Sequence, residues 1–102
     1  MPQYPLGPRP GGTFSALNVS ATTNLLGQTT VVPTTLYRVS VTTAGSGAGA
    51  VYDNDSTSTG NTAANLIASI PNTVGVYEFI FPVKTGIVYV PGSGQVASIS
   101  FS

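Results

Sequence analysis

Three segments of the chain alternate between apolar and polar positions. In residues 36–42, Leu-Tyr-Arg-Val-Ser-Val-Thr, the side chains of Tyr37, Val39 and Val41 would share one face of an extended backbone. Residues 76–81 and 96–101 repeat the alternation. A period of two predicts β-strands that pack one face on a core and turn the other toward solvent or a partner. The shared parity predicts a common core made of Tyr37, Val39, Val41, Phe79, Phe81, Ile99 and Phe101.

Shorter apolar segments extend the β pattern over the rest of the chain. They predict strands at residues 15–21, 50–53, 66–70 and 86–90. No segment repeats apolar residues at helical spacing, and strands recur about every ten residues, which is typical of a β-sandwich or small barrel. We therefore expect an all-β chain, folded as a single antiparallel β-sandwich of jelly-roll or immunoglobulin-like type.

Prolines and glycines predict where these strands end. Pro82 lies within an apolar run, and because proline lacks a backbone N–H, that segment should be a sheet edge or be kinked. The sequence Pro91-Gly92-Ser93-Gly94 predicts a turn that closes the last two strands, with the positive φ of a type II turn at Gly92. Gly45 to Gly49 resembles a phosphate-binding loop, but a strand follows it instead of a helix, so we interpret it as a flexible connection.

The first twelve residues differ from the rest of the chain in composition. Prolines at positions 2, 5, 8 and 10 favour an extended, polyproline-like arm over residues 1–12, followed by the β-sandwich domain at residues 13–102. We expect Tyr4, Leu6 and Arg9 to be partner-binding residues, through two apolar contacts and one charge-assisted hydrogen bond. A disordered tail without a role and a proline-rich ligand motif at residues 5–9 are the alternatives.

The charge content excludes several classes of function. Only 6% of the residues are charged, against about 25% in a typical soluble domain, and the three basic and three acidic residues cancel. Three scattered Lys or Arg residues cannot neutralise a run of phosphates, so no nucleic-acid binding is expected. No apolar run approaches about 18 residues, so neither a membrane span nor a standard secretion signal is expected.

Candidates for chemistry are few. The chain has no histidine and no cysteine, and the surroundings of Lys84 do not suggest a nucleophile. Residues 53–57, Asp-Asn-Asp-Ser-Thr, place oxygens at alternate positions as a calcium loop does, but Ser58 and Ala64 stand where such a loop needs glycine and glutamate. We interpret the cluster as a polar turn held by Asx hydrogen bonds, with a calcium loop or a glycosidase carboxylate pair as weaker alternatives. We assign no catalytic, cofactor-binding or metal-binding residue and expect no enzyme activity.

The segments together resemble a known kind of viral protein. The resemblance rests on residues 37–46, 49–53, 60–68, 81–90 and 92–101, about two-thirds of the chain. In overall pattern these are similar to small virion proteins of tailed bacteriophages, which are β-sandwich modules that decorate capsids or form parts of fibres and spikes. No catalytic motif is carried over.

The resemblance implies a structural role. A capsid decoration or cement protein would bind the major capsid protein on the outer surface of the head, as a homo-oligomer, after synthesis in the cytoplasm of the bacterial host. The low charge suits a subunit whose edges and faces are covered in an assembly. The alternative is a tail-fibre, head-fibre or spike module that binds a host glycan, for which the candidate rings are Tyr4, Tyr52 and Tyr89.

Overall fold

The computed structural model describes residues 14–25 and 35–102, and a little over half of these residues lie in strands. The strands are β1 (Phe14–Val19), β2 (Thr23–Asn24), β3 (Thr35–Thr43), β4 (Gly49–Tyr52), β5 (Leu66–Ile70), β6 (Gly75–Pro82), β7 (Val88–Val90) and β8 (Val96–Phe101), with one 3₁₀ turn, η2 (Ala63–Asn65), before β5. The expected all-β class is confirmed.

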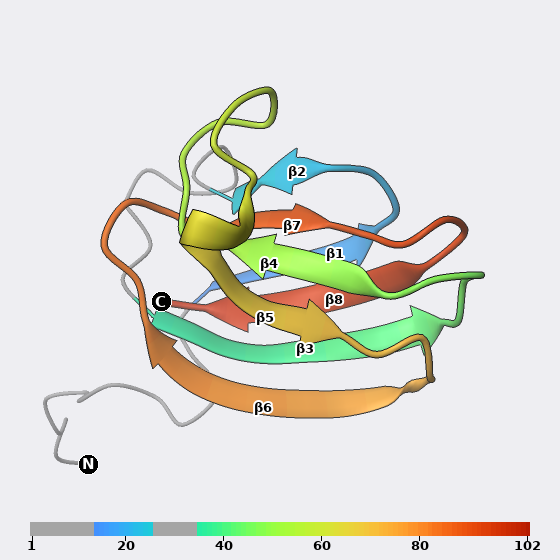
Figure 1. The fold of residues 1–102 in the computed structure, drawn as a ribbon. Coiled ribbons are helices and arrows are strands. Elements are labelled where there is room, and N and C mark those ends of the chain that lie inside the picture. The colour runs from blue at the N-terminus through green and yellow to red at the C-terminus, as the bar shows by residue number, and fades with distance from the viewer. Residues whose placement is uncertain (1–13, 26–34) are drawn as a thin grey trace, which may run out of the picture.

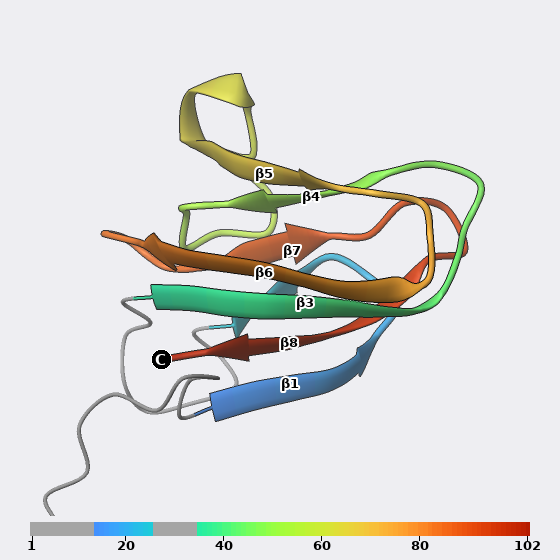
Figure 2. The ribbon, with the colours of Figure 1, turned by 90° about the horizontal axis from the view of Figure 1, so that it is seen from below.

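The strands form two antiparallel sheets of four. One has the order β1-β8-β3-β6 and the other the order β2-β7-β4-β5. The two sheets lie in separate layers (Figures 1 and 2). Their facing side chains form one core, which includes Leu36, Val39, Val41, Ile99 and Phe101 from the first sheet and Leu25, Val51, Ile70, Ile87 and Tyr89 beside or within the second.

The last two strands do not form the hairpin that the sequence predicts. β7 pairs with β2 and β4, whereas β8 pairs with β1 and β3, so the turn between them crosses from one layer to the other. The turn also lies later than expected: the N–H of Gln95 donates to the carbonyl of Gly92 at 2.9 Å, and Gly94 has the positive φ, +78°.

Most of the predicted core is confirmed, but Phe81 is an exception. Tyr37, Val39, Val41, Ile99 and Phe101 are buried, and Phe79 is half-buried against them. Phe81, in contrast, is 45% exposed.

Phe81 lies beside a β-bulge in β6, near the end of this edge strand. Arg38 pairs with Glu78 while Leu36 pairs with Phe81, so two steps along β3 match three along β6. The extra residue disturbs the strand locally, and Ile80 adopts a φ of +49°, which is unusual for a β-branched side chain. Phe81 itself pairs with the buried Leu36, so its exposure comes from its position on the edge strand β6. As expected from Pro82, β6 lies at a sheet edge.

Candidate functional site

The arm residues predicted to bind a partner, Tyr4, Leu6 and Arg9, lie outside the described residues, and so does the predicted arm at 1–12. Two of the three rings considered for glycan binding can be placed. Tyr52 is half-buried, and Tyr89 is fully buried with its hydroxyl donating to Oε1 of Gln95. Tyr89 is therefore not available as a sugar platform.

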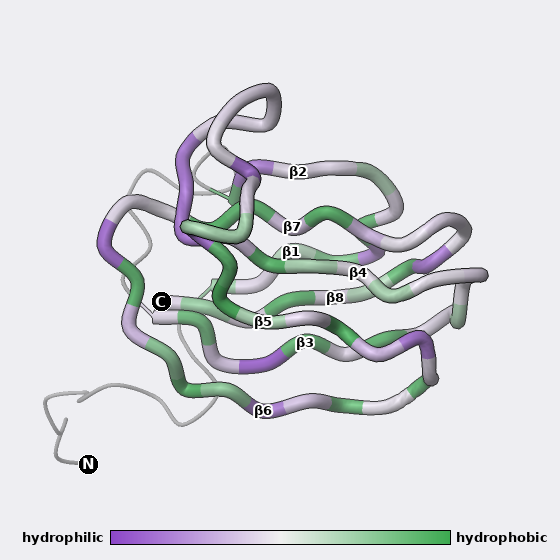
Figure 3. The backbone as a smooth tube through the Cα atoms, in the orientation of Figure 1, coloured by the Kyte–Doolittle hydropathy of each residue, from purple (hydrophilic) through white to green (hydrophobic). Residues whose placement is uncertain are grey.

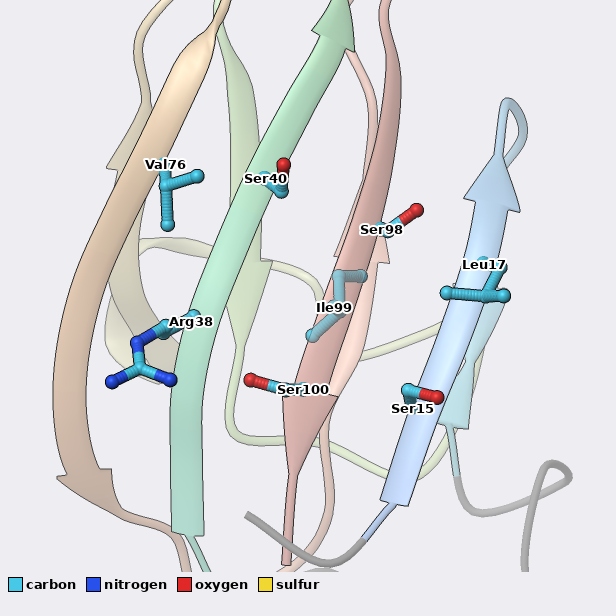
Figure 4. A pocket seen from close by; sticks show the side chains of 8 residues that line it. All are labelled: Ser15, Leu17, Arg38, Ser40, Val76, Ser98, Ile99 and Ser100. Carbon is cyan, nitrogen blue, oxygen red and sulfur yellow. The ribbon is translucent and has the colours of Figure 1, made fainter. Parts of the chain in front are cut away.

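The outer face of the first sheet consists mainly of small polar side chains and aliphatic side chains. Figure 4 shows its side chains: serines of β3 and β8 lie between Leu17 on one edge strand and Val76 on the other, and Ser15 lies on the same strand as Leu17. The outer face comprises Ser15, Leu17, Arg38, Ser40, Val76, Ser98 and Ser100, around a shallow hollow of about 180 Å³. Small hydroxyl and aliphatic side chains of this kind can lie against another protein surface.

The charges beside this face neutralise each other. Nε and Nη2 of Arg38 donate to Oε2 of Glu78 at 3.0 and 2.8 Å. Both side chains are substantially exposed, so we expect the pair to contribute less than about 1 kcal/mol to stability. Its main effect is that the outer face carries no net charge.

Exposed apolar side chains gather where the edge strands β5 and β6 lie on the same side of the molecule (Figures 1 and 2). We define the β5–β6 side by Leu66, Val74, Val76, Ile80 and Phe81. Within the described ranges only one other large apolar side chain is exposed, Leu17. Figure 3 shows apolar segments along β6 on either side of a short hydrophilic segment.

The core is incompletely covered on the same side. Five apolar residues are only partly buried against the core, and four of them, Ile67, Ala68, Tyr77 and Phe79, belong to β5 or β6. β6 contains no fully buried residue along its eight positions. The β5–β6 side therefore has two kinds of accessible apolar residue: exposed ones at the surface and partly buried ones that pack against the core.

A second hollow, of about 350 Å³, lies at the end of this side and contains polar groups. It is lined in part by Asp53, Asn65, Phe81, Lys84 and Thr85. The carboxylate of Asp53 accepts hydrogen bonds from the N–H groups of Thr85 at 2.8 Å, Lys84 at 3.0 Å and Gly86 at 3.3 Å. These bonds tie the end of β4 to the segment between β6 and β7.

The hydrogen bonds also determine the protonation of Asp53. Burial raises the pKa of its carboxyl, but the N–H groups of Thr85, Lys84 and Gly86 outweigh this effect and, with the nearby charge of Lys84, hold the pKa below its usual value. A carboxylate that is ionised and already saturated with donors is poorly suited to act as a general acid. In the described part of the chain, no three acidic side chains come together as a metal site would need.

The predicted polar turn after Asp53 is confirmed and centres on Asn54. Its side-chain amide donates to the carbonyls of Ser56 at 3.1 Å and Thr59 at 2.6 Å and to Oδ1 of Asn61 at 3.0 Å. Asn54 is buried beneath this loop. The side chain thus replaces backbone hydrogen bonds that the irregular loop cannot make for itself.

The glycine-rich segment before β4, predicted to be a flexible connection, is held by a backbone contact. The N–H of Ser46 donates to the carbonyl of Ser93 at 2.8 Å, which joins this loop to the turn between β7 and β8. Gly92 lies so close to the same loop that a Cβ atom there would come within 1.9 Å of the carbonyl oxygen of Gly47. The two glycine-containing loops therefore pack backbone against backbone.

Sequence reasoning missed the β5–β6 side, although one signal for it was present. In residues 76–81, Val76 and Ile80 would point to the face of the strand opposite to the one that faces the predicted core. When both faces of one strand carry apolar residues, both faces are expected to pack against other parts of a protein. The sheet order was also needed, because it shows that β6 is an edge strand with no further described strand beside it.

Comparisons with known proteins yield no relatives: no family model, no curated protein and no solved structure matches the chain. In the ranges that the structure describes, no helix has the length and apolar character needed to cross a membrane.

Proposed function

We propose that the chain is a non-enzymatic structural protein of a tailed-bacteriophage virion. In this role it is a capsid decoration or cement protein that binds the major capsid protein on the outer surface of the head and stabilises the head by bridging subunits. It is made in the cytoplasm of the bacterial host and acts as a homo-oligomer.

One observation carries the proposal: the described surface combines an uncovered apolar side with internally paired charges. Arg38 neutralises Glu78, and the carboxylate of Asp53 is held by backbone N–H groups. A free monomer of this size normally keeps a net charge of about 2 to 8 in magnitude, whereas this chain has a net charge of zero. In the described ranges it also exposes five large apolar side chains on β5, on β6 and in the loop between them. Such a surface suits a subunit that is covered by neighbours.

The two antiparallel sheets support a β-sandwich of jelly-roll or immunoglobulin-like type as the finer description of the fold. In the proposal, residues 1–12 form the extended arm that attaches this domain to the capsid, with Tyr4, Leu6 and Arg9 as anchors. A stiff, proline-rich segment loses less conformational entropy on docking than a Gly-Ser tail, which favours this use of it.

A second candidate function, a fibre or spike module that binds a host glycan, is favoured by the hollow beside Phe81. The exposed ring of Phe81 lines this hollow together with Lys84 and Asn65, which gives an apolar surface with polar residues around it, as sugar sites have. The ring is exposed because β6 is the edge strand of its sheet.

Deleting residues 1–12 should weaken binding to heads by at least about tenfold, because two apolar anchors and one charged hydrogen bond are lost. The measurement is titration of labelled full chain and of residues 13–102 onto particles that lack the protein, with circular dichroism to show that the shortened chain folds. A full-length Tyr4→Ala, Leu6→Ala, Arg9→Ala variant keeps the arm's length and should show the same loss.

Equal binding by all three proteins would show that the arm is passive. Absence of binding by the full chain, together with binding to purified host glycans that Phe81→Ala abolishes, would replace decoration by the second function.

A further inference from the structure

The connection between β6 and β7 is anchored in the core at both ends and exposed in its middle. β6 belongs to the first sheet and β7 to the second, so the connection runs from one layer to the other (Figures 1 and 2). Val83 and Ile87, near its two ends, are buried members of the core. Between them, the side chains of Lys84 and Thr85 are exposed. The middle of the connection therefore needs some other contact to hold it in place.

The carboxylate of Asp53 supplies that contact. Its Oδ1 accepts hydrogen bonds from the N–H groups of Thr85 at 2.8 Å and Gly86 at 3.3 Å, and its Oδ2 accepts from that of Lys84 at 3.0 Å. Within the described ranges these three N–H groups have no other acceptor, because strand pairing stops with β6 and resumes with β7. One side chain thus holds three consecutive backbone groups.

We propose that Asp53 is an acid-released latch on this connection. Above about pH 5 the carboxylate holds residues 84–86 against the end of β4, and in more acidic solution its protonation lets the segment open while the two sheets stay intact. Lys84 and Thr85 line the second hollow together with Phe81, so opening changes the shape of that hollow. The inference goes beyond the proposed function and applies to either candidate.

The latch depends on charge because hydrogen bonds to an ionised acceptor are about twice as strong as those between neutral groups. Protonation of Asp53 also converts one of its two oxygens into an O–H donor, which leaves fewer acceptor positions for three N–H groups. The contacts to Lys84 and Thr85 lie at the exposed surface, so water can replace the carboxylate there. Opening of the segment therefore leaves these two donors satisfied.

The direction of the pH effect follows from the pKa of Asp53. Burial raises the pKa of this carboxyl, but the N–H groups of Thr85, Lys84 and Gly86, with the charge of Lys84, hold it below its ordinary value of 3.8. Because the closed form has the lower pKa, the latch keeps its full strength above the pKa of the open form. It weakens as the pH falls through the pKa of the closed form. The latch is therefore released below about pH 4.

Few other titratable groups surround Asp53 in the described part of the chain. The connection contributes the cation of Lys84, and the turn after β4 contributes Asp55. Tyr52 of β4 is a phenol, which stays uncharged in acid, and η2 and β5 contribute uncharged residues alone. Glu78 is paired with an arginine across the first sheet. An acid response at residues 84–86 can therefore be assigned by substituting the carboxylates one at a time.

The test is nuclear magnetic resonance of the isotope-labelled full chain between about pH 6 and pH 3. Hydrogen-exchange protection of the amides of residues 84–86, corrected for the intrinsic effect of pH on exchange, should fall about fivefold. The loss of one net hydrogen bond changes an opening equilibrium by about this factor. The amides of Val39 and Ile99, which pair in the middle of the first sheet, should keep their protection within about twofold.

Asp53→Asn is the decisive variant, because its amide resembles the protonated carboxyl in having one acceptor oxygen and no charge. At about pH 6 its residues 84–86 should already show the low protection, and acid should lower it no further. Asp55→Asn is the matched control. Asp55 is exposed in the same turn, and its side chain makes no hydrogen bond within the described ranges, so this variant should respond to acid as the wild type does.

Three results would overturn the inference. Unchanged protection of residues 84–86 in the acidified wild type would show that Asp53 does not act as a latch. A full acid response in Asp53→Asn would assign the effect to another group. Simultaneous loss of protection in β3 and β8 would show general acid unfolding. If Asp53→Asn does not fold, the wild-type titration and Asp55→Asn still decide, because residues 84–86 must open in both while the sheets stay protected.

Discussion

Replacing Gln95 by leucine should lower the free energy of unfolding by about 3 kcal/mol, although the substitution adds apolar surface to a buried site. Gln95 is fully buried just before β8. Its Oε1 accepts from the hydroxyl of Tyr89 and from the N–H of Gly92 at 3.2 Å, and its amide donates to the carbonyl of Pro71 at 3.1 Å. Leucine would leave these three groups without a partner, and each unsatisfied buried group costs about 1–3 kcal/mol.

The environment of Tyr89 shows how strongly this site is desolvated, since burial raises the pKa of its hydroxyl to about 12. Chemical denaturation of Gln95→Leu and Tyr89→Phe gives the comparison. Tyr89→Phe removes one donor and leaves Gln95 with its other partners, so its cost should be only about 1 kcal/mol. A Gln95→Leu variant as stable as the wild type would contradict the role assigned to this network.

Replacing Gly92 by alanine should also cost about 3 kcal/mol, through a steric conflict rather than a lost hydrogen bond. A Cβ atom at this position would lie 1.9 Å from the carbonyl oxygen of Gly47 and 3.0 Å from that of Ala48. Both of these oxygen atoms belong to the backbone, so the clash can be removed only if the two loops move apart. The same movement would disturb the N–H of Gly92, which donates to Gln95.

Gly47→Ala is the matched control, because it lies in the same loop contact but a Cβ atom there would meet nothing within 4 Å. We expect its stability to equal that of the wild type or exceed it by about 0.5 kcal/mol, since alanine restricts the unfolded chain. Thermal or denaturant unfolding of the two variants tests the packing of the loops. Equal stabilities would show that the loops do not meet as described.

The sequence was sufficient to predict those features of the fold that depend on local alternation. The period of two in residues 36–42 and 96–101 identified β3 and β8 and the side chains that they bury. β2 was missed because two residues are too few to show a period. The layer to which β7 belongs could not be predicted, since the turn after Pro91 can either close a hairpin or cross between sheets.

The irregular features depend on partners that are remote in sequence. Phe81 continues the alternation of Tyr77 and Phe79 and pairs with the buried Leu36, but it is exposed because β6 is the edge strand of its sheet. The acceptor role of Asp53 depends on N–H groups more than 30 residues later in the chain, at Lys84 and beyond. Both features shape the candidate site, so its outline could be obtained only from the assembled sheets.

Electron cryomicroscopy of intact particles tests the structural-virion proposal most directly. The comparison is between particles carrying the chain and particles from a phage in which its coding sequence is deleted. We predict a difference density of two-layered β-domains on the outer surface of the head, in contact with the major capsid protein, that is missing from the deletion particles. Density confined to fibres or spikes would favour glycan binding instead, and identical particles in both samples would contradict a virion role altogether.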